Sequence, residues 1–401
     1  MLCRDRSRIR YNEVMKIGID ARFYGKAGPG RYAKNILQEL ENVDKENQYI
    51  IFMNQEGYDS YHPRNPNFKK YLANNTWYSF DEQIRYFLKV LWQNLDLYYV
   101  PHFNIPILYP KKIVTAIPDM TMHTFSTESA TTLPKPYFLL KKLVYRFVFW
   151  WALFRSTKVI VPSEAVRKEF IQTFKKFPPS KFVLAPEGVD PDLTRLNANP
   201  EYVLKKYGIE KPYILHVGSM YVHKNVDGVV EMFKILRNKY GYKGKLVLVS
   251  KIDKFSKRMN EKIEKEGLVG HVILPAFKVS NPNSDIVVSD DEVSALRTQA
   301  QAYVFASFAE GFSLTALESM IYDLPCAISR IPVHEEVHGD SVLYFDPYDP
   351  QDMAKVVNEL LTNEGLRKEL IKKGHEQVKK YNWRNTAEVT LSVFNNVLKN
   401  L

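Results

Sequence analysis

Residues 16–40, KIGIDARFYGKAGPGRYAKNILQEL, decide the class of fold. The stretch opens with an apolar strand pattern over 16–20 and ends with apolar residues at helical spacing over 32–40. Between these two patterns lies a loop with three glycines, Gly25, Gly28 and Gly30. A strand, a glycine-rich loop and a helix in this order begin a doubly wound α/β domain. The stretch therefore predicts a parallel sheet with helices on both faces.

Further short apolar runs predict the remaining strands. In the first half of the chain they cover 49–53, 97–100, 113–117 and 159–162. In the second half they cover 213–217, 245–249, 271–274, 302–306, 326–329 and 341–345. Helical segments separate most of these runs, and strands that alternate with helices favour parallel sheets. The chain therefore predicts two doubly wound domains of similar size that face each other across a cleft.

The 401 residues divide into four segments. Residues 1–14 read as a flexible extension or as the product of a start codon assigned too early, and residues 15–196 form the first domain. Residues 197–375 form the second domain, after a stretch, Asn-Ala-Asn-Pro, that is typical of a hinge. The last segment, 376–401, is predicted to be helical and to cross back over the first domain.

Composition excludes several classes of protein. The 56 Lys and Arg exceed the 45 Asp and Glu, which indicates a preference for anions. The basic residues are spread along the chain without a nucleic-acid-binding motif, so no nucleic acid is expected as a partner. The two cysteines, Cys3 and Cys326, lie too far apart in sequence to suggest a disulfide framework. No apolar run approaches the roughly 20 residues of a membrane span, and no signal peptide opens the chain, so we expect a cytoplasmic protein.

Residues 306–323, ASFAEGFSLTALESMIYD, carry the densest pattern of candidate site residues. Glu310 and Glu318 are eight apart, and Ser313 can cap a helix that begins between them. The free amides at such a helix start suit a diphosphate, and they belong to Phe312, Ser313, Leu314 and Thr315, after Gly311. One carboxylate can then face a pyranose and the other a ribose, as in a nucleotide sugar. The alternative is a helix with two surface acids.

A second candidate loop, GSMYVHKN, covers residues 218–225. It follows the first strand of the second domain, at the sheet edge where ligands bind in open α/β sheets. Lys224 can place its ammonium on the phosphates and stabilise a leaving group, with Ser219 and His223 beside it. The alternative is a solvated lysine in a turn.

Together these motifs resemble the retaining glycosyltransferases of family 4, which have the GT-B fold with two Rossmann-like domains. The acid pair matches the E-x7-E motif of that family, and the resemblance extends over nearly the whole chain from Met15. It implies that Glu310 lies near the donor sugar, Glu318 at the ribose and Lys224 at the phosphates. His223 stands where the family usually has an arginine. The resemblance also implies that the second domain binds the donor and the first domain the acceptor.

Two further segments of the first domain gain a role from the same resemblance. The sequence GPGRY, residues 28–32, is similar to the family's glycine loop, which implies that Gly28 and Gly30 approach the donor phosphates. The alternative is an ordinary tight turn. The sequence PDMTMH, residues 118–123, lies where many members have a His-Asp pair. Here Asp119 remains as a candidate catalytic residue, and His123 is a second candidate, although a lone histidine is more often structural.

A basic, aromatic segment over 135–158 has two interpretations. Its basic residues are Lys135, Lys141, Lys142, Arg146, Arg155 and Lys158, interleaved with Tyr137, Phe138, Tyr145, Phe147, Phe149, Trp150 and Trp151. Such a helix can rest on an anionic membrane near a lipid-linked acceptor. It can also be a core helix of the first domain with a solvated basic edge, which we prefer because apolar residues surround much of it.

The expected function is retaining, metal-independent transfer of a hexose of the mannose or glucose type. The donor would be GDP-mannose or a UDP-sugar, and the acceptor a glycan or lipid-linked hydroxyl in cell-surface polysaccharide synthesis. No cofactor is expected and no metal, since Asp290-Asp291 is better explained as a helix cap. Peripheral contact with the inner face of the membrane would be compatible with this role. The alternatives are a sugar-nucleotide epimerase or phosphorylase of the same architecture, and a non-enzymatic basic protein that binds anions.

Overall fold

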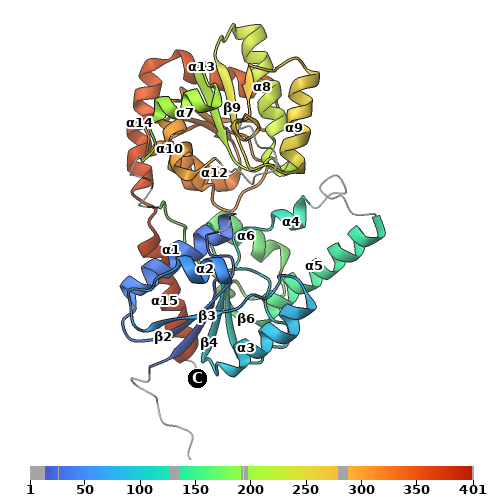
Figure 1. Ribbon diagram of the computed structural model, residues 1–401, viewed down its shortest axis with the longest axis vertical. Coiled ribbons are helices and arrows are strands. Elements are labelled where there is room, and N and C mark those ends of the chain that lie inside the picture. The colour runs from blue at the N-terminus through green and yellow to red at the C-terminus, as the bar shows by residue number, and fades with distance from the viewer. Residues whose placement is uncertain are drawn as a thin grey trace, which may run out of the picture.

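The structure is a computed structural model that describes residues 14–25, 27–125, 135–190, 193, 197–278 and 288–399. The extension expected over 1–14 lies outside these residues, apart from Val14. Two domains lie one above the other along the long axis of the molecule (Figure 1). The sheet ladders in both are parallel among the described residues, which confirms the predicted fold class.

The first domain is built on a sheet that, within the described residues, has seven strands in the order β3-β2-β1-β4-β5-β6-β7. The strands are β1 (Lys16–Asp20), β2 (Gln48–Met53), β3 (Phe68–Leu72), β4 (Leu97–Val100), β5 (Lys112–Ala116), β6 (Ser156–Val161) and β7 (Phe182–Leu184). The helices are α1 (Ala27–Val43), α2 (Gln55–Ser60), the π-helix η1 (Glu82–Tyr86), α3 (Phe87–Trp92), α4 (Thr121–Thr124), α5 (Lys135–Arg155), α6 (Glu164–Thr173) and the 3₁₀ turn η3 (Pro179–Lys181).

The second domain repeats this design on a sheet with the order β10-β9-β8-β11-β12-β13. The strands are β8 (Tyr213–Val217), β9 (Lys245–Val249), β10 (Val272–Ile273), β11 (Ala302–Phe305), β12 (Cys326–Ser329) and β13 (Leu343–Phe345). The helices are α7 (Pro200–Tyr207), η5 (Val222–Lys224), α8 (Val226–Tyr240), α9 (Lys254–Lys265), η6 (Pro275–Phe277), α10 (Asp290–Gln299), α11 (Leu314–Met320), α12 (Pro332–His338), α13 (Pro350–Thr362) and α14 (Glu364–Val378). Apolar residues of each sheet alternate between its two faces, so both faces carry a core.

The glycine loop differs from the sequence-based expectation. Helix α1 begins at Ala27, so Gly28 and Gly30 lie in its first turn and not in a loop before Tyr32. The chain reverses earlier, at Gly25, whose φ is +73°. A Cβ at Gly30 would lie 2.1 Å from the carbonyl oxygen of Phe23. Gly30 is therefore needed so that α1 can start against the preceding turn.

The last helix, α15 (Trp383–Lys399), packs on the first domain. Its buried residues Phe394 and Val397 share a core with Ile17 of β1 and Leu37 of α1. Lys112 of β5 also donates to the carbonyl of Val397 at 2.7 Å. Figure 1 shows α14 beside the upper domain and α15 within the lower one. The C-terminal segment thus ties the two domains together.

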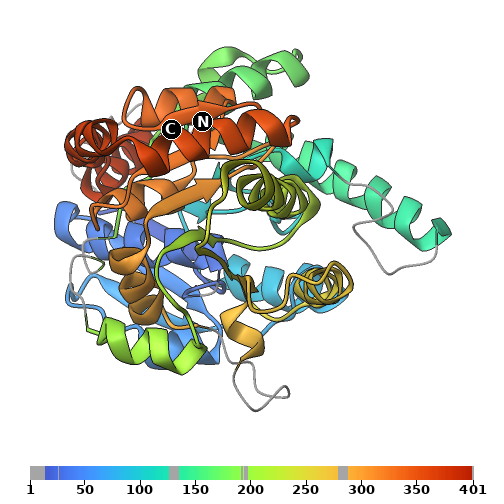
Figure 2. The same cartoon turned by 90° about the horizontal axis from the view of Figure 1, so that it is seen from above.

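Helix α5 is only partly a core helix. It projects from the first domain, away from the rest of the molecule (Figures 1 and 2). Its C-terminal half buries Phe149, Ala152 and Leu153, whereas Leu143 and Phe147 are 67% and 51% exposed. The preferred core interpretation therefore holds for the C-terminal half alone; the side chains of Lys135, Tyr137 and Phe138 lie outside the described part. Among the described residues, no helix is both long and apolar enough to cross a membrane.

Candidate active site

A cavity of about 750 Å³ lies between the two domains. Its walls are segments that follow β1, β5, β6 and β7 in the first domain and β8, β9 and β11 in the second. The carboxyl ends of both parallel sheets therefore meet at this cavity, as expected for ligand sites of doubly wound folds. The predicted site residues that line it are Gly28, Asp119, Ser219, Lys224, Glu310, Gly311, Phe312, Ser313, Leu314, Thr315 and Glu318.

Lys224 and Glu310 form an ion pair in the cavity wall. The Lys224 Nζ lies 2.7 Å and 2.8 Å from the two carboxylate oxygens of Glu310. The side chains are only 18% and 10% exposed. Burial disfavours the ionised carboxylate, but the charges and hydrogen bonds around it, led by the Lys224 ammonium, together hold the pKa of Glu310 below its ordinary value. The pair therefore places a cationic and an anionic side chain side by side in the cavity.

The turn after Lys224 fixes that side chain. Asn225 adopts a left-handed conformation with φ of +53° and begins α8. Its side chain accepts a hydrogen bond from the Gly228 amide at 3.2 Å and donates to the Pro347 carbonyl at 2.7 Å. Asparagine tolerates this backbone region better than most residues. Asn225 therefore makes the turn that directs the Lys224 side chain into the cavity.

Helix α11 starts at the cavity, but Ser313 does not cap it as predicted. Ser313 occupies the N-cap position with φ of +71°, and its hydroxyl makes no cap hydrogen bond. The left-handed backbone turns that hydroxyl away from the helix start, in contrast to the extended backbone of ordinary caps. The first amides of α11 are therefore left without a side-chain cap at the cavity wall.

Gly311 lets the two domains approach each other beside α11. A Cβ at this position would lie 2.3 Å from the carbonyl oxygen of Pro118 in the first domain. The Gly311 carbonyl also accepts a hydrogen bond of 3.0 Å from the hydroxyl of Ser163, which caps α6. The Glu336 carboxylate of the second domain accepts from the first amides of α6 at 2.6 Å and 2.7 Å. These contacts cross the domain boundary and hold the cavity at its present width.

Glu318 lies between two arginines. Arg297 of α10 donates to one carboxylate oxygen at 2.6 Å, and Arg31 of α1 donates to the other at 3.1 Å. Arg31 also reaches Asp290 at 2.5 Å. Asp290 is therefore an ion-pair partner in the first turn of α10 and not a cap, because Ser289 caps that helix in a capping box with Glu292. Glu318 reaches the cavity wall, but its two oxygens are held by the arginines in this structure.

Neither of the predicted histidines is among the residues that line the cavity. His123 is not in contact with the cavity; its Nδ1 is 3.1 Å from the Tyr145 hydroxyl and its ring packs on Phe149 at 4.7 Å. His223 also lies outside the lining, and burial followed by the Lys224 charge lowers the pKa of its imidazole. Gly30 is outside the lining too, inside α1. Asp119 does face the cavity and accepts a hydrogen bond from the Thr121 amide at 2.8 Å.

Four charged groups of the site are not predicted from the sequence. Arg31, Arg297 and Asp290 complete the Glu318 network, and Glu187 lines the cavity after β7. Burial, helped by the nearby Asp119 carboxylate, raises the pKa of Glu187 to about 7. Only the position of these residues in the sequence could have indicated a role in the site, since Arg31 follows the glycines and Glu187 follows the end of a strand. Their partners are far away in sequence, so no spacing rule joins them.

Comparisons with known proteins agree with this geometry. Residues 204–377 match the family described as glycosyl transferases group 1. The chain is 26% identical to serotype-specific mannosyltransferase WbdA of Escherichia coli, over 61% of this chain and 29% of that protein. It is also 26% identical to O-antigen chain mannosyltransferase B of Escherichia coli, over 60% of this chain and 61% of that protein. The chain thus spans less than two thirds of the length of these relatives.

The fold comparison covers both domains. Sucrose-phosphate synthase from Thermosynechococcus elongatus superposes with a TM-score of 0.73 and 15% identity, over 96% of this chain and 100% of that one. Identity at this level supports the fold alone. The segment that matches the glycosyl transferases group 1 family, residues 204–377, thus forms most of the second domain of a chain with the GT-B fold.

Proposed function

We propose that this chain transfers a hexose from a nucleoside diphosphate sugar to a hydroxyl of a glycan or lipid-linked acceptor. The observation that carries the proposal is the Lys224–Glu310 pair beside the uncapped start of α11, inside the interdomain cavity. A cation and free amides suit a diphosphate, while carboxylates suit sugar hydroxyls. The two Escherichia coli relatives reported above carry the name mannosyltransferase, which favours GDP-mannose as donor ahead of a UDP-sugar.

The chemistry needs only groups of the chain itself. The Lys224 ammonium and the α11 amides stabilise the negative charge that develops on the leaving diphosphate. Glu310 keeps Lys224 in place and offers its carboxylate to the sugar. Asp119 lines the cavity from the first domain and would face the acceptor. The bond from the anomeric carbon to the diphosphate would break, and the acceptor hydroxyl would bond that carbon from the same face and pass its proton to the leaving diphosphate, which gives retention; neither a metal nor a cofactor is required in this scheme.

Donor hydrolysis tests the proposal before the acceptor is known. The protein should slowly release GDP from GDP-mannose, or UDP from a UDP-sugar, and Lys224→Ala and Glu310→Ala should each abolish the release. Lys234→Ala is a matched control, because Lys234 forms exposed ion pairs on α8 outside the cavity. Conversion of one nucleotide sugar into another without acceptor would support the epimerase alternative. Absence of turnover and of nucleotide binding would leave only the anion-binding alternative.

We propose that the reaction takes place at an anionic membrane surface that carries a growing polysaccharide. Exposed apolar side chains gather on α5, on η1–α3 and on the loop between them, and we name this set the apolar face. Ile107, in the loop, connects the three segments. Its amide donates a hydrogen bond to the Gln83 side chain of η1 at 2.8 Å, and its carbonyl accepts one from the Trp151 side chain of α5 at 2.9 Å. The face consists of Ile84, Leu88, Trp92, Leu108, Leu139, Leu140, Leu143, Val144, Phe147 and Phe154.

Basic side chains of α5 give the apolar face a preference for anionic lipid. Lys141 and Arg146 are exposed on the same helix, and such a combination binds the headgroup region of a bilayer. Cosedimentation with vesicles tests this contact. Wild type should bind phosphatidylglycerol-containing vesicles, and Leu143→Glu together with Phe147→Glu should reduce binding. Tyr202→Glu, an exposed site on α7, is the matched control; equal binding by all three proteins would exclude the contact.

A further inference from the structure

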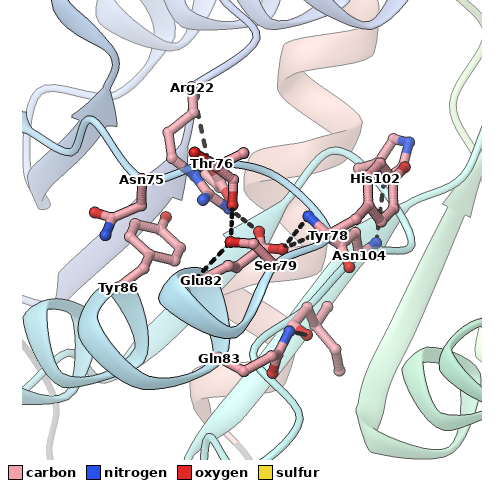
Figure 3. Close-up of polar contacts among 12 residues, drawn as sticks. Arg22, Asn75, Thr76, Tyr78, Ser79, Glu82, Gln83, Tyr86, His102 and Asn104 are labelled. Carbon is pink, nitrogen blue, oxygen red and sulfur yellow. Dashed lines mark hydrogen bonds and ion pairs between the residues drawn. The ribbon is translucent and has the colours of Figure 1, made fainter.

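A buried ion cluster fills the first domain beside the end of β1. The guanidinium of Arg22 donates to both carboxylate oxygens of Asp20, at 2.9 Å and 2.8 Å, and to Glu82 at 2.6 Å. It also lies 3.9 Å from the ring centroid of Trp77 and 3.6 Å from that of Tyr86. The ion-pair side chains are completely buried. Figure 3 shows how Arg22 and Glu82 meet in this cluster.

Such a cluster contributes little net stability, because desolvating three charges offsets most of their attraction. Its clearest structural consequence is the conformation of one exposed loop. The second carboxylate oxygen of Glu82 accepts hydrogen bonds from the Tyr78 amide at 2.8 Å and from Asn104 at 2.7 Å (Figure 3). These bonds hold Tyr78 at φ of +56°, a region that bulky residues rarely adopt. Strained backbone of this kind is concentrated at functional sites.

The loop presents an aromatic ring to solvent. Tyr78 is 62% exposed, although its backbone is fixed by a buried carboxylate. Its ring lies 6.2 Å from that of His102 and 6.3 Å from that of Phe103. Phe103 in turn packs edge-on against Tyr145 at 5.2 Å.

This row of rings leads to the cavity. Pro101, the residue before His102, lines the cavity, and so does Asp119. At the other end of the row, burial and the nearby Asp119 carboxylate raise the pKa of Tyr145. An acceptor chain that leaves the cavity beside Pro101 can therefore reach the Tyr78 ring.

We infer that Tyr78 is a stacking surface for a second sugar ring of the acceptor, so that the acceptor is an oligosaccharide chain and not a single sugar. The inference rests on the proposed function and adds to it the size of the acceptor. A tyrosine suits this role because it offers a rigid, amphipathic face at low entropic cost. The Arg22–Glu82 cluster is the positioning device, since it fixes the loop before the acceptor arrives.

Calorimetric titration of acceptor analogues tests the inference. The probes are methyl mannoside, a mannose disaccharide and a mannose tetrasaccharide, each added in the presence of GDP. Wild type should bind the disaccharide about tenfold more tightly than the monosaccharide, which is the increment that one stacked ring supplies. Tyr78→Gly should lose this increment, and Tyr78→Phe should keep most of it. Glycine tolerates the positive φ, so the Tyr78→Gly protein should melt no earlier than wild type.

A control variant and the remaining outcomes of the titration separate the stacking role of Tyr78 from other roles. Tyr202→Ala removes an equally exposed tyrosine of the second domain and should leave the increment unchanged. An equal increment in Tyr78→Gly, or affinity in wild type that does not rise with length, would overturn the inference. Loss of vesicle binding by Tyr78→Gly with an unchanged increment would instead assign Tyr78 to a lipid contact. Failure of wild type to bind any nucleotide would refute the proposed function itself.

Discussion

Arg31 of the first domain and Glu318 of the second domain share a hydrogen bond of 3.1 Å across the cavity. Arg31 is 39% exposed, whereas Glu318 is almost completely buried. The second carboxylate oxygen of Glu318 is bound by Arg297 from its own domain. The bond between Arg31 and Glu318 is thus a reversible link between the domains, at the residue expected to meet the ribose of a donor.

Removal of Arg31 should loosen the domain closure. In Arg31→Ala both Glu318 and Asp290 lose their partner from the first domain, so the unliganded protein should populate wider interdomain angles. Small-angle scattering should then give a larger radius of gyration than wild type. Arg31→Lys keeps the charge and should lie between the two. Identical scattering curves for all three proteins would show that other contacts set the closure.

Loss of Lys224 should affect chemistry more than folding. Removing one electrostatic stabiliser of a leaving group typically lowers kcat by about 100-fold to 1000-fold. The variant Lys224→Ala should show this loss of kcat. The variant Lys224→Arg should recover only part of the lost kcat, because a guanidinium has a different shape from an ammonium. Without Lys224 the pKa of Glu310 should rise, since its main stabilising charge is gone. Steady-state kinetics of both variants, over a range of donor concentrations, check the prediction.

The buried Arg297–Glu318 pair should be costly to break from one side. Both side chains are almost completely buried, so Arg297→Met leaves a carboxylate with a single, partly exposed partner. We expect a loss of about 3 kcal/mol in unfolding free energy, in the range for one-sided removal of a buried charge. The double variant Arg297→Met, Glu318→Leu should lose less than the sum of the single changes. Urea denaturation measures both; additive losses would contradict a direct pair.

Glu187 predicts a pH dependence of stability. Its pKa is raised from 4.5 to about 7, by burial first and Asp119 second. The folded state therefore binds the proton more tightly than the unfolded state, so this group's contribution is fully present below about pH 4.5 and is lost as pH rises through about 7. Glu187→Gln removes that dependence, and its melting temperature relative to wild type should increase between those pH values. A difference that does not change with pH would contradict the raised pKa.

Much of the fold could be predicted because buried strands are short, apolar and separated by helices. The runs that became β4, β8, β9 and β12 were predicted with their observed bounds. Strand β3 was missed because its sequence, FKKYL, carries two lysines at the sheet edge, and β7 was missed because three residues give too little pattern. The start of α1 was predicted too late, because its first turn contains two glycines and a proline that normally indicate a loop.

The site was predictable where its residues are close in sequence. Glu310 and Glu318 are joined by one loop and one helix, and Lys224 follows a strand, so their meeting at the cavity could be expected. The contact of Arg31 with Glu318 could not be predicted, because Arg31 comes from the other domain and only the packing of the two domains brings it there. The hydroxyl of Ser313 turned away because the backbone at that position is left-handed, which residue type alone does not indicate.

Calorimetric titration with GDP and with UDP tests the central claim most directly. We expect one of the two to bind at a single site, and Lys224→Ala to weaken that binding at least about tenfold, a change of about 1.4 kcal/mol. The bound nucleotide should also raise the unfolding free energy by about 2.7 kcal/mol at a hundredfold excess over Kd. Binding that is equally weak for both nucleotides, indifferent to Lys224 and abolished by moderate salt would contradict a nucleotide-sugar site in this cavity.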